Sequence, residues 1–308
     1  MKVAIVGSGA IGLYYGMQLA FAGAEVRFLL RSDLAAVRAR GSLIARDPAG
    51  TKELRPVAAF GTPEEIGPVD LVLVTLKSTS GADLRSLLAP LLGPETAILT
   101  LQNGLGADET LAAQFGPERI LGGLAYIAVN RTGPGEVYCY GSEAIALGEF
   151  GRPALARTRE LADLFVRAGI PIRLTDNLDF ARWQKLVWNV PFNGLTIAAG
   201  GIATDVICRD PELTREVREL MREIQAAAAK LGHAITDDFL RQRYDITPPM
   251  GAYRPSSLVD FLAGREVEVE PIWGEALRRG RAAGAEMPRL AALYERLSGL
   301  CGPGRRPG

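Results

Sequence analysis

The feature that most constrains this chain is the spacing of three glycines near its start, at positions 7, 9 and 12. They follow a short β-branched run, residues 2–6, and open a helix-favouring stretch that extends to about residue 22. Strand, tight turn and helix in this order form the context in which Gly-x-Gly-x-x-Gly binds the diphosphate of a dinucleotide. We therefore predict a Rossmann-type phosphate loop that consists of Gly7, Ser8, Gly9, Ala10, Ile11 and Gly12.

The first half of the chain alternates apolar strand-like runs with helical stretches. The predicted strands lie at residues 26–30, 71–76 and 97–101. Strands that alternate with helices indicate βαβ units and a doubly wound parallel sheet, which we expect over residues 1–174. After Gly122 the segments become short and alternating, at 136–140 and 144–149, which predicts antiparallel additions at the sheet edge.

Helical periodicity dominates the second half of the chain. Amphipathic stretches lie at residues 211–231, 258–262 and 272–283. Because 308 residues exceed what one hydrophobic core usually serves, we expect a second, all-helical domain over residues 175–308. Its final segment, 302–308, has no apolar residue to anchor it and is expected to be a loose tail. The amphipathic faces leave two uses open, an intramolecular core and a homodimer.

Charge and cysteine usage exclude several classes of partner. Thirty-five basic residues balance 35 acidic ones, so no net field attracts nucleic acid or an anionic membrane, and we expect a small-molecule partner. Three separated cysteines and one histidine fit neither a metal site nor a disulfide framework, and they indicate a reducing cytoplasm. No apolar run reaches the ~18 residues of a membrane span. The glycine pattern explains residues 20–24 better than a signal-peptide cleavage site does.

The residues after the second predicted strand bear on the choice of dinucleotide. NAD-specific sites usually place Asp or Glu there to bind the ribose 2′-hydroxyl. This chain has Arg31, and a guanidinium suits the 2′-phosphate of NADP. Asp33 is the competing residue, but with Ser32 it is interpreted as the N-cap of a helix that begins at Leu34. The sequence favours NADP(H) over NAD, with a merely solvated Arg31 as the alternative.

A helical stripe offers a proton donor other than histidine. The one histidine, His233, follows a long helix, where an imidazole more often caps free carbonyls. Lys185, Asn189 and Asn193 are spaced to share one face of a predicted helix. They lie among Trp, Val, Leu and Phe, which a merely solvated lysine does not explain. Pro191 could kink this helix and end the stripe early.

Three further signals place polar residues at the boundaries of predicted elements. Ser256 and Ser257 precede a predicted helix, which they either cap or leave for a ligand. Glu268 alternates with valines, a pattern typical of an exposed carboxylate. Lys77 and the segment 102–104, Gln-Asn-Gly, each follow a predicted strand, and ligands of open α/β sheets bind at such strand ends. Each signal alone is weak.

Together these residues resemble the ketopantoate reductase (2-dehydropantoate 2-reductase) family, from Met1 to about Ala283. The motifs that occur in the family's order are the glycine loop, Arg31, Lys77, the segment 102–104, the stripe of Lys185, Asn189 and Asn193, and the segment 255–268. The resemblance implies an NADP-dependent oxidoreductase that reduces the 2-oxo group of ketopantoate to pantoate, a step toward pantothenate and coenzyme A.

Catalysis is implied by the resemblance to depend on two residues. Lys185 is the expected general acid, which protonates the forming alkoxide as NADPH delivers hydride, and Glu268 assists from a position near lysine and substrate. An ammonium can also stabilise the developing oxyanion. Desolvation between Trp183 and Trp188 is expected to lower the pKa of Lys185 toward a working value.

The resemblance also implies binding residues. Substrate contacts are implied for Asn103, Asn189, Asn193 and Ser256, and cofactor contacts for Lys77, Asn103, Arg31 and the glycine loop. Three departures from the family pattern are Ser78-Thr79-Ser80, Val267 and Pro191. They leave the substrate open, so another small 2-oxo acid remains an alternative, as does a non-catalytic NADPH sensor.

Overall fold

The chain divides into two compact units. In the computed structural model, residues 1–302 are described, apart from the side chain of Ser142. The expected tail, 302–308, therefore lies outside the described residues except for its first member. The first unit contains residues 1–102 and 107–178, and the second contains residues 103–106 and the chain from Asp179 onward.

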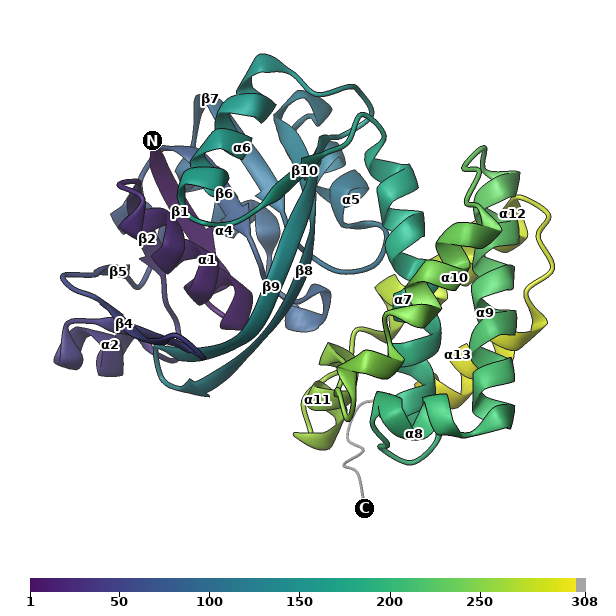
Figure 1. Cartoon of the computed structure of the whole chain (residues 1–308). Coiled ribbons are helices and arrows are strands. Elements are labelled where there is room, and N and C mark those ends of the chain that lie inside the picture. Colours follow the sequence, from purple (N-terminus) through teal and green to yellow (C-terminus); the bar gives the residue numbers. More distant parts are fainter. Residues whose placement is uncertain (303–308) are drawn as a thin grey trace. The chain divides into compact units, whose positions relative to one another are not determined.

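The first unit is built on one mixed sheet, to which the described residues contribute ten strands (Figure 1). Their order is β4-β3-β9-β8-β7-β6-β1-β2-β5, and β10 pairs with β9. The strands are β1 (Lys2–Val6), β2 (Glu25–Leu29), β3 (Leu43–Asp47), β4 (Gly50–Leu54), β5 (Ala58–Phe60), β6 (Val69–Val74), β7 (Leu92–Thr100), β8 (Ile120–Gly133), β9 (Glu136–Glu149) and β10 (Ile172–Leu174). In the part of this order from β8 through β7, β6, β1 and β2 to β5, all neighbouring strands are parallel, which confirms the predicted parallel sheet.

Helices cover both faces of this sheet. Val3 and Ile5 of β1 belong to one hydrophobic core and Ala4 and Val6 to another, because alternate residues of a strand point to opposite faces. The first core includes side chains of α1 and α6, and the second includes side chains of α4 and α5. The helices and 3-10 turns of this unit are α1 (Ala10–Phe21), α2 (Leu34–Arg40), α3 (Pro63–Ile66), η1 (Ser78–Ser80), α4 (Leu84–Leu88), η2 (Ala89–Leu91), α5 (Ala107–Phe115), η3 (Pro117–Arg119) and α6 (Ala156–Arg167).

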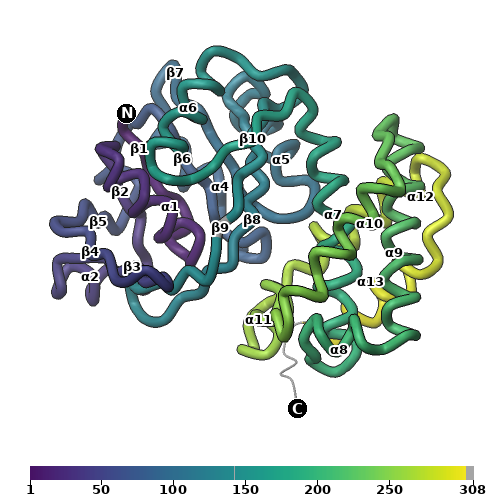
Figure 2. The backbone as a smooth tube through the Cα atoms, viewed as in Figure 1, coloured from purple at the N-terminus to yellow at the C-terminus, as the bar shows by residue number. Residues whose placement is uncertain are grey.

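The antiparallel part of the sheet differs from the prediction. The two expected short segments form one 14-residue strand, β9, which pairs with β8 as the long hairpin that Figure 2 traces. This hairpin is not the sheet edge, because β3 and β10 both pair with the other side of β9. The sequence analysis does not find β3 and β4, since their charged residues hide the strand pattern.

The second unit is helical, as predicted. Its elements are α7 (Leu178–Ala198), α8 (Thr204–Arg209), α9 (Pro211–Lys230), α10 (Asp237–Asp245), η4 (Pro248–Met250), α11 (Ser256–Leu262), the short π-helix η5 (Glu270–Gly274), α12 (Glu275–Ala282) and α13 (Pro288–Cys301). One core joins apolar side chains of α7, such as Leu186, to Ile224 of α9 and Trp273 of η5. Among the described residues, no helix has both the length and the apolar character to cross a membrane.

Candidate active site

The glycine loop connects β1 to α1, as the sequence predicts. Gly7 adopts a φ of 101°, in the left-handed region that favours glycine. A Cβ on Gly12 would lie 2.4 Å from the Gly7 carbonyl oxygen, so only glycine allows this approach of helix to strand. Thr75 donates a hydrogen bond to the same carbonyl, and Ser8 Oγ donates to Leu29 O at 2.8 Å. The loop is thus fixed from both neighbouring strands.

Free space and free donors adjoin the same loop. Apart from Gly9 itself and its two chain neighbours, no heavy atom lies within 4 Å of the position that a Cβ on Gly9 would take. Gly9 is the N-cap of α1 and provides no side-chain cap. Within residues 1–302, the backbone N–H groups of Ala10, Ile11 and Gly12 have no hydrogen-bond acceptor. Unpaired donors at a helix N-terminus beside open space fit a diphosphate.

The segment after β2 contains Arg31 and Asp33, whose side chains differ in exposure. The Arg31 side chain is exposed, and the Asp33 side chain is 6% exposed. Asp33 occupies the N-cap position of α2, but its carboxylate makes no capping hydrogen bond. It accepts instead from Gly135 N at 2.7 Å and from Arg131. The predicted N-cap position of Asp33, before a helix that begins at Leu34, is confirmed, but its carboxylate does not cap that helix because it binds donors of the hairpin of β8 and β9.

Lys77 and Gln102 lie at the ends of adjacent strands in the first unit. Lys77 follows β6 and is partly buried, and Gln102 follows β7, where its Oε1 accepts from Thr100 Oγ1 at 3.1 Å. Strand β6 pairs in parallel with both β1 and β7. The carboxyl ends of the three strands therefore meet at one edge of the sheet, the usual ligand edge of this fold.

In the second unit, α7 carries the predicted polar stripe. The helix continues through Pro191 to Ala198, so the proline does not end the stripe. Lys185 and Asn189 are partly buried, whereas Asn193 is 2% exposed. Lys185 and Asn189 thus retain access to a ligand, and Asn193 is enclosed.

Asn193 supplies the cap that the two serines do not provide. Its Oδ1 accepts from Ser257 N at 3.0 Å, at the start of α11. The N-cap residue of α11 is Pro255, and no side chain of the N-cap itself makes a capping bond. Ser256 is the exposed first residue of the helix. The Ser256 hydroxyl thus stays exposed, and the implied substrate contact of Asn193 stays a prediction.

Asn103 is brought to Lys185 by a short loop that belongs to the second unit. Lys185 Nζ donates to Asn103 Oδ1 at 3.0 Å, across 82 positions of sequence. Leu105 N donates to Pro271 O at 2.9 Å. A Cβ on Gly104, whose φ is 77°, would lie 2.2 Å from this oxygen. Residues 103–106 therefore pack directly on the backbone of η5, and this packing fixes the amide of Asn103.

Charged side chains surround the ammonium of Lys185. Burial, followed by the positive charge of Arg182, lowers the pKa of Lys185 from 10.5 to about 7, and the negative charge of Glu268 opposes this change. Arg182 is 4% exposed and Glu268 8% exposed. Arg182 Nη1 also donates to Gly104 O at 3.1 Å. We call Lys185, Asn103, Arg182 and Glu268 the lysine cluster.

The lowered pKa of Lys185 is expected from the sequence, but the contribution of Arg182 is not. The sequence spacing could have indicated Arg182, because it precedes Lys185 by three residues and a helix places such residues on one face. Of the two tryptophans, Trp183 is fully buried, while Trp188 stacks on Phe192 and donates to Thr247 Oγ1 at 2.9 Å. An ammonium with a pKa near neutrality, beside an amide and a carboxylate, can act as a general acid.

His233 does not cap carbonyls with its ring. Its Nε2 lies 2.7 Å from Asp179 Oδ2, at the start of α7. The turn after α9 is closed instead by the backbone, where His233 N donates to Ala228 O at 2.8 Å. The expected capping role is therefore wrong, because Asp179 provides a better partner. Among the described residues, no group of three or more His, Cys, Asp or Glu side chains is arranged to hold a metal ion.

Comparisons with known proteins agree in both units. The family model described as ketopantoate reductase PanE/ApbA matches residues 3–152, and the model of that family's C-terminal domain matches residues 177–300. A 2-dehydropantoate 2-reductase from Nostoc sp. is 36% identical over 99% of this chain and 96% of its own length.

Solved structures extend the agreement to the fold. A crystal structure of 2-dehydropantoate 2-reductase from Geobacter metallireducens is 42% identical, with a TM-score of 0.94 over 97% of this chain and 99% of the other. A D-mandelate dehydrogenase with NADH and anilino(oxo)acetate is 23% identical and shares the fold, with a TM-score of 0.88 over 97% of each chain. Since two family models and a relative of similar length agree, the chain belongs to the ketopantoate reductase family of oxidoreductases.

Proposed function

We propose that this protein reduces the 2-oxo group of ketopantoate to give pantoate, with NADPH as the reductant. The observation that supports this most directly is the pKa of Lys185, about 7, on an ammonium that is hydrogen bonded to Asn103. A group with a pKa near 7 is about half protonated at neutral pH and can both hold and release a proton there. Membership of the ketopantoate reductase family supports ketopantoate as the proposed substrate. The product would serve pantothenate and coenzyme A synthesis, and three free cysteines fit a reducing cytoplasm.

The proposed proton step belongs to Lys185. NADPH, when bound, supplies a hydride that forms the new C–H bond at the carbonyl carbon. As the C=O π bond breaks, Lys185 Nζ transfers a proton to the oxygen, which forms the hydroxyl of the product. Asn103 fixes Nζ through its amide oxygen at 3.0 Å, and Glu268 favours the protonated lysine before transfer. The amine then regains a proton from solvent.

Further residues are proposed to bind the two ligands. For the substrate, the exposed hydroxyl of Ser256 and the partly buried amide of Asn189 are available for its oxygen atoms. For the cofactor, the free N–H groups of α1 would hold the diphosphate, and Lys77 is proposed to lie near it. The exposed guanidinium of Arg31 would hold the 2′-phosphate, which favours NADPH over NADH.

Oxidation of NADPH in the presence of a panel of 2-oxo acids tests the proposal. The panel contains ketopantoate, pyruvate, 2-oxoisovalerate and phenylglyoxylate, each assayed with NADPH and with NADH. We expect the highest kcat/KM for ketopantoate with NADPH. A higher value for another acid would assign the same chemistry to that substrate. If no acid is turned over while NADPH still binds, the result would favour a non-catalytic NADPH sensor.

A further inference from the structure

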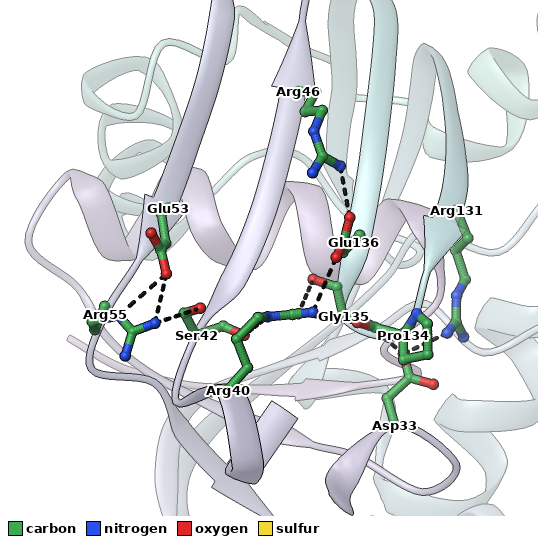
Figure 3. A network of polar contacts seen from close by, with 10 residues as sticks. All are labelled: Asp33, Arg40, Ser42, Arg46, Glu53, Arg55, Arg131, Pro134, Gly135 and Glu136. Carbon is green, nitrogen blue, oxygen red and sulfur yellow. Dashed lines mark hydrogen bonds and ion pairs between the residues drawn. The ribbon is translucent and has the colours of Figure 1, made fainter. Parts of the chain in front are cut away.

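The carboxylate of Asp33 accepts hydrogen bonds from the hairpin of β8 and β9, whose donors lie 98 and 102 positions further along the chain. Arg131, on β8, donates to Asp33 Oδ2, and Gly135 N donates to the same oxygen at 2.7 Å (Figure 3). Ser32 Oγ donates to Oδ1 at 3.1 Å. Burial by itself would raise the pKa of Asp33, but the hydrogen bonds of Arg131 and Gly135 outweigh it and lower the pKa. The carboxylate therefore stays ionised in its enclosed position.

The hairpin turn is held in place by contacts that do not involve Asp33. Arg40, the last residue of α2, donates to Pro134 O at 3.0 Å and to Gly135 O at 3.2 Å. Glu136, which follows the turn, accepts from Arg40 at 3.0 Å and from Arg46 of β3 at 2.7 Å (Figure 3). Arg131 and Gly135 are thus presented to Asp33 by a turn that is fixed independently.

The position of Asp33 gives this enclosure a consequence for cofactor choice. In Rossmann-type sites, a carboxylate just after the second strand accepts a hydrogen bond from the ribose 2′-hydroxyl of NAD and repels the 2′-phosphate of NADP. Asp33 lies four residues after the end of β2 and is the one carboxylate between positions 30 and 40. Its neighbour Arg31 is exposed, and none of the described residues is hydrogen bonded to its guanidinium.

We propose that Arg131 is a specificity-determining residue of the cofactor site, which keeps Asp33 turned into the hairpin and balances its charge. The proposal rests on the proposed binding of NADPH at Arg31. Arg131 acts through Asp33: with the pair intact, the 2′-phosphate meets Arg31 without a competing carboxylate. With Arg131 removed, an unbalanced carboxylate remains two residues from Arg31, where it repels the phosphate and can accept a bond from a 2′-hydroxyl.

Dissociation constants for NADPH and NADH, measured without any 2-oxo acid from the fluorescence of the reduced nicotinamide, test this proposal. For Arg131→Gln we expect NADPH to bind about tenfold more weakly, while NADH binds as well as before or better. The matched control is Arg46→Gln, which removes another arginine from the same network without touching Asp33, and it should leave the ratio of the two constants unchanged.

The double variant Arg131→Gln with Asp33→Asn shows whether Arg131 acts through Asp33. Because no carboxylate then remains near Arg31, the double variant should recover the NADPH preference. An unchanged ratio in Arg131→Gln would overturn the proposal. Failure of the double variant to recover would also overturn it, since Arg131 would then contact the phosphate itself. The dissociation constants of the unmodified protein test the proposed use of NADPH separately, because that proposal requires NADPH to bind more tightly than NADH.

Discussion

The phosphate loop of the first unit and the lysine cluster of the second are built in opposite ways. Residues 7–12 contain no ionisable side chain, and they offer backbone N–H groups and the space beside Gly9. The lysine cluster places Lys185, Arg182 and Glu268 in buried or partly buried positions, and burial, followed by the charges of Arg182 and Glu268, sets the pKa of Lys185. The loop of residues 7–12 thus offers space and backbone donors, whereas the lysine cluster depends on burial and charge.

This contrast predicts two kinds of failure. A substitution in the phosphate loop should weaken cofactor binding to the same extent at every pH, because nothing in the loop titrates near neutrality. A substitution of Lys185, Arg182 or Glu268 in the lysine cluster should leave cofactor binding intact and change either the rate or its pH dependence.

The largest effect is expected from Lys185→Ala. Loss of the general acid should lower kcat for ketopantoate reduction by about 10² to 10⁴, while the dissociation constant of NADPH stays the same. Steady-state assays and a fluorescence titration measure the two quantities. Lys230→Ala, at the exposed end of α9, is the control and should behave like the unmodified protein. Unchanged turnover in Lys185→Ala would show that another group donates the proton.

Gly9→Val should weaken NADPH binding by about tenfold to a hundredfold, or ~1.4–2.8 kcal/mol. Gly9 has a φ of −76° and open space around its Cβ position, so the loop should fold normally while valine occupies the path of the diphosphate. Gly141→Val is the matched control, because that glycine on β9 also faces open space. If Gly9→Val and Gly141→Val both bind NADPH as tightly as the unmodified protein does, the diphosphate does not approach Gly9.

The same contrast explains what the sequence could predict. The phosphate loop, β1 and the parallel strands follow from local spacing, since turn and helix are encoded within twelve neighbouring residues. The long strand β9 and the β3–β4 pair do not, because their register is fixed by pairing with strands far along the chain.

The candidate site follows a similar rule. Lys185 and its stripe are visible as a helical pattern, but the contact with Asn103 spans 82 positions, and only the family resemblance links the two in advance. Asp33 fits a helix cap when its neighbours alone are considered, whereas its true partners lie 98 and 102 positions away. Local patterns therefore locate the polar groups, and long-range packing decides what each one does.

Arg182→Gln sharpens the part that charge plays in the lysine cluster. Removal of the positive charge should raise the pKa of Lys185, because the charge of Arg182 lowers it. Under the proposed mechanism the protonated lysine is the active form, so kcat/KM for reduction should fall as pH rises through this pKa. The fall should therefore begin at a higher pH in the variant. If the rate drops at every pH and the profile keeps its position, Arg182 only supports the loop.

Glu268→Gln should have the smaller and opposite effect. The negative charge of Glu268 raises the pKa of Lys185, so its removal should lower that pKa and move the fall in kcat/KM to lower pH. Glu268 is the weakest of the three influences, so the displacement should be smaller than for Arg182→Gln and cost a few-fold in rate at neutral pH. Profiles of kcat/KM against pH for both variants, measured at saturating NADPH, compare the two displacements directly. Displacement of both profiles in the same direction would contradict the assignment of the charges around Lys185, since their signs require opposite shifts.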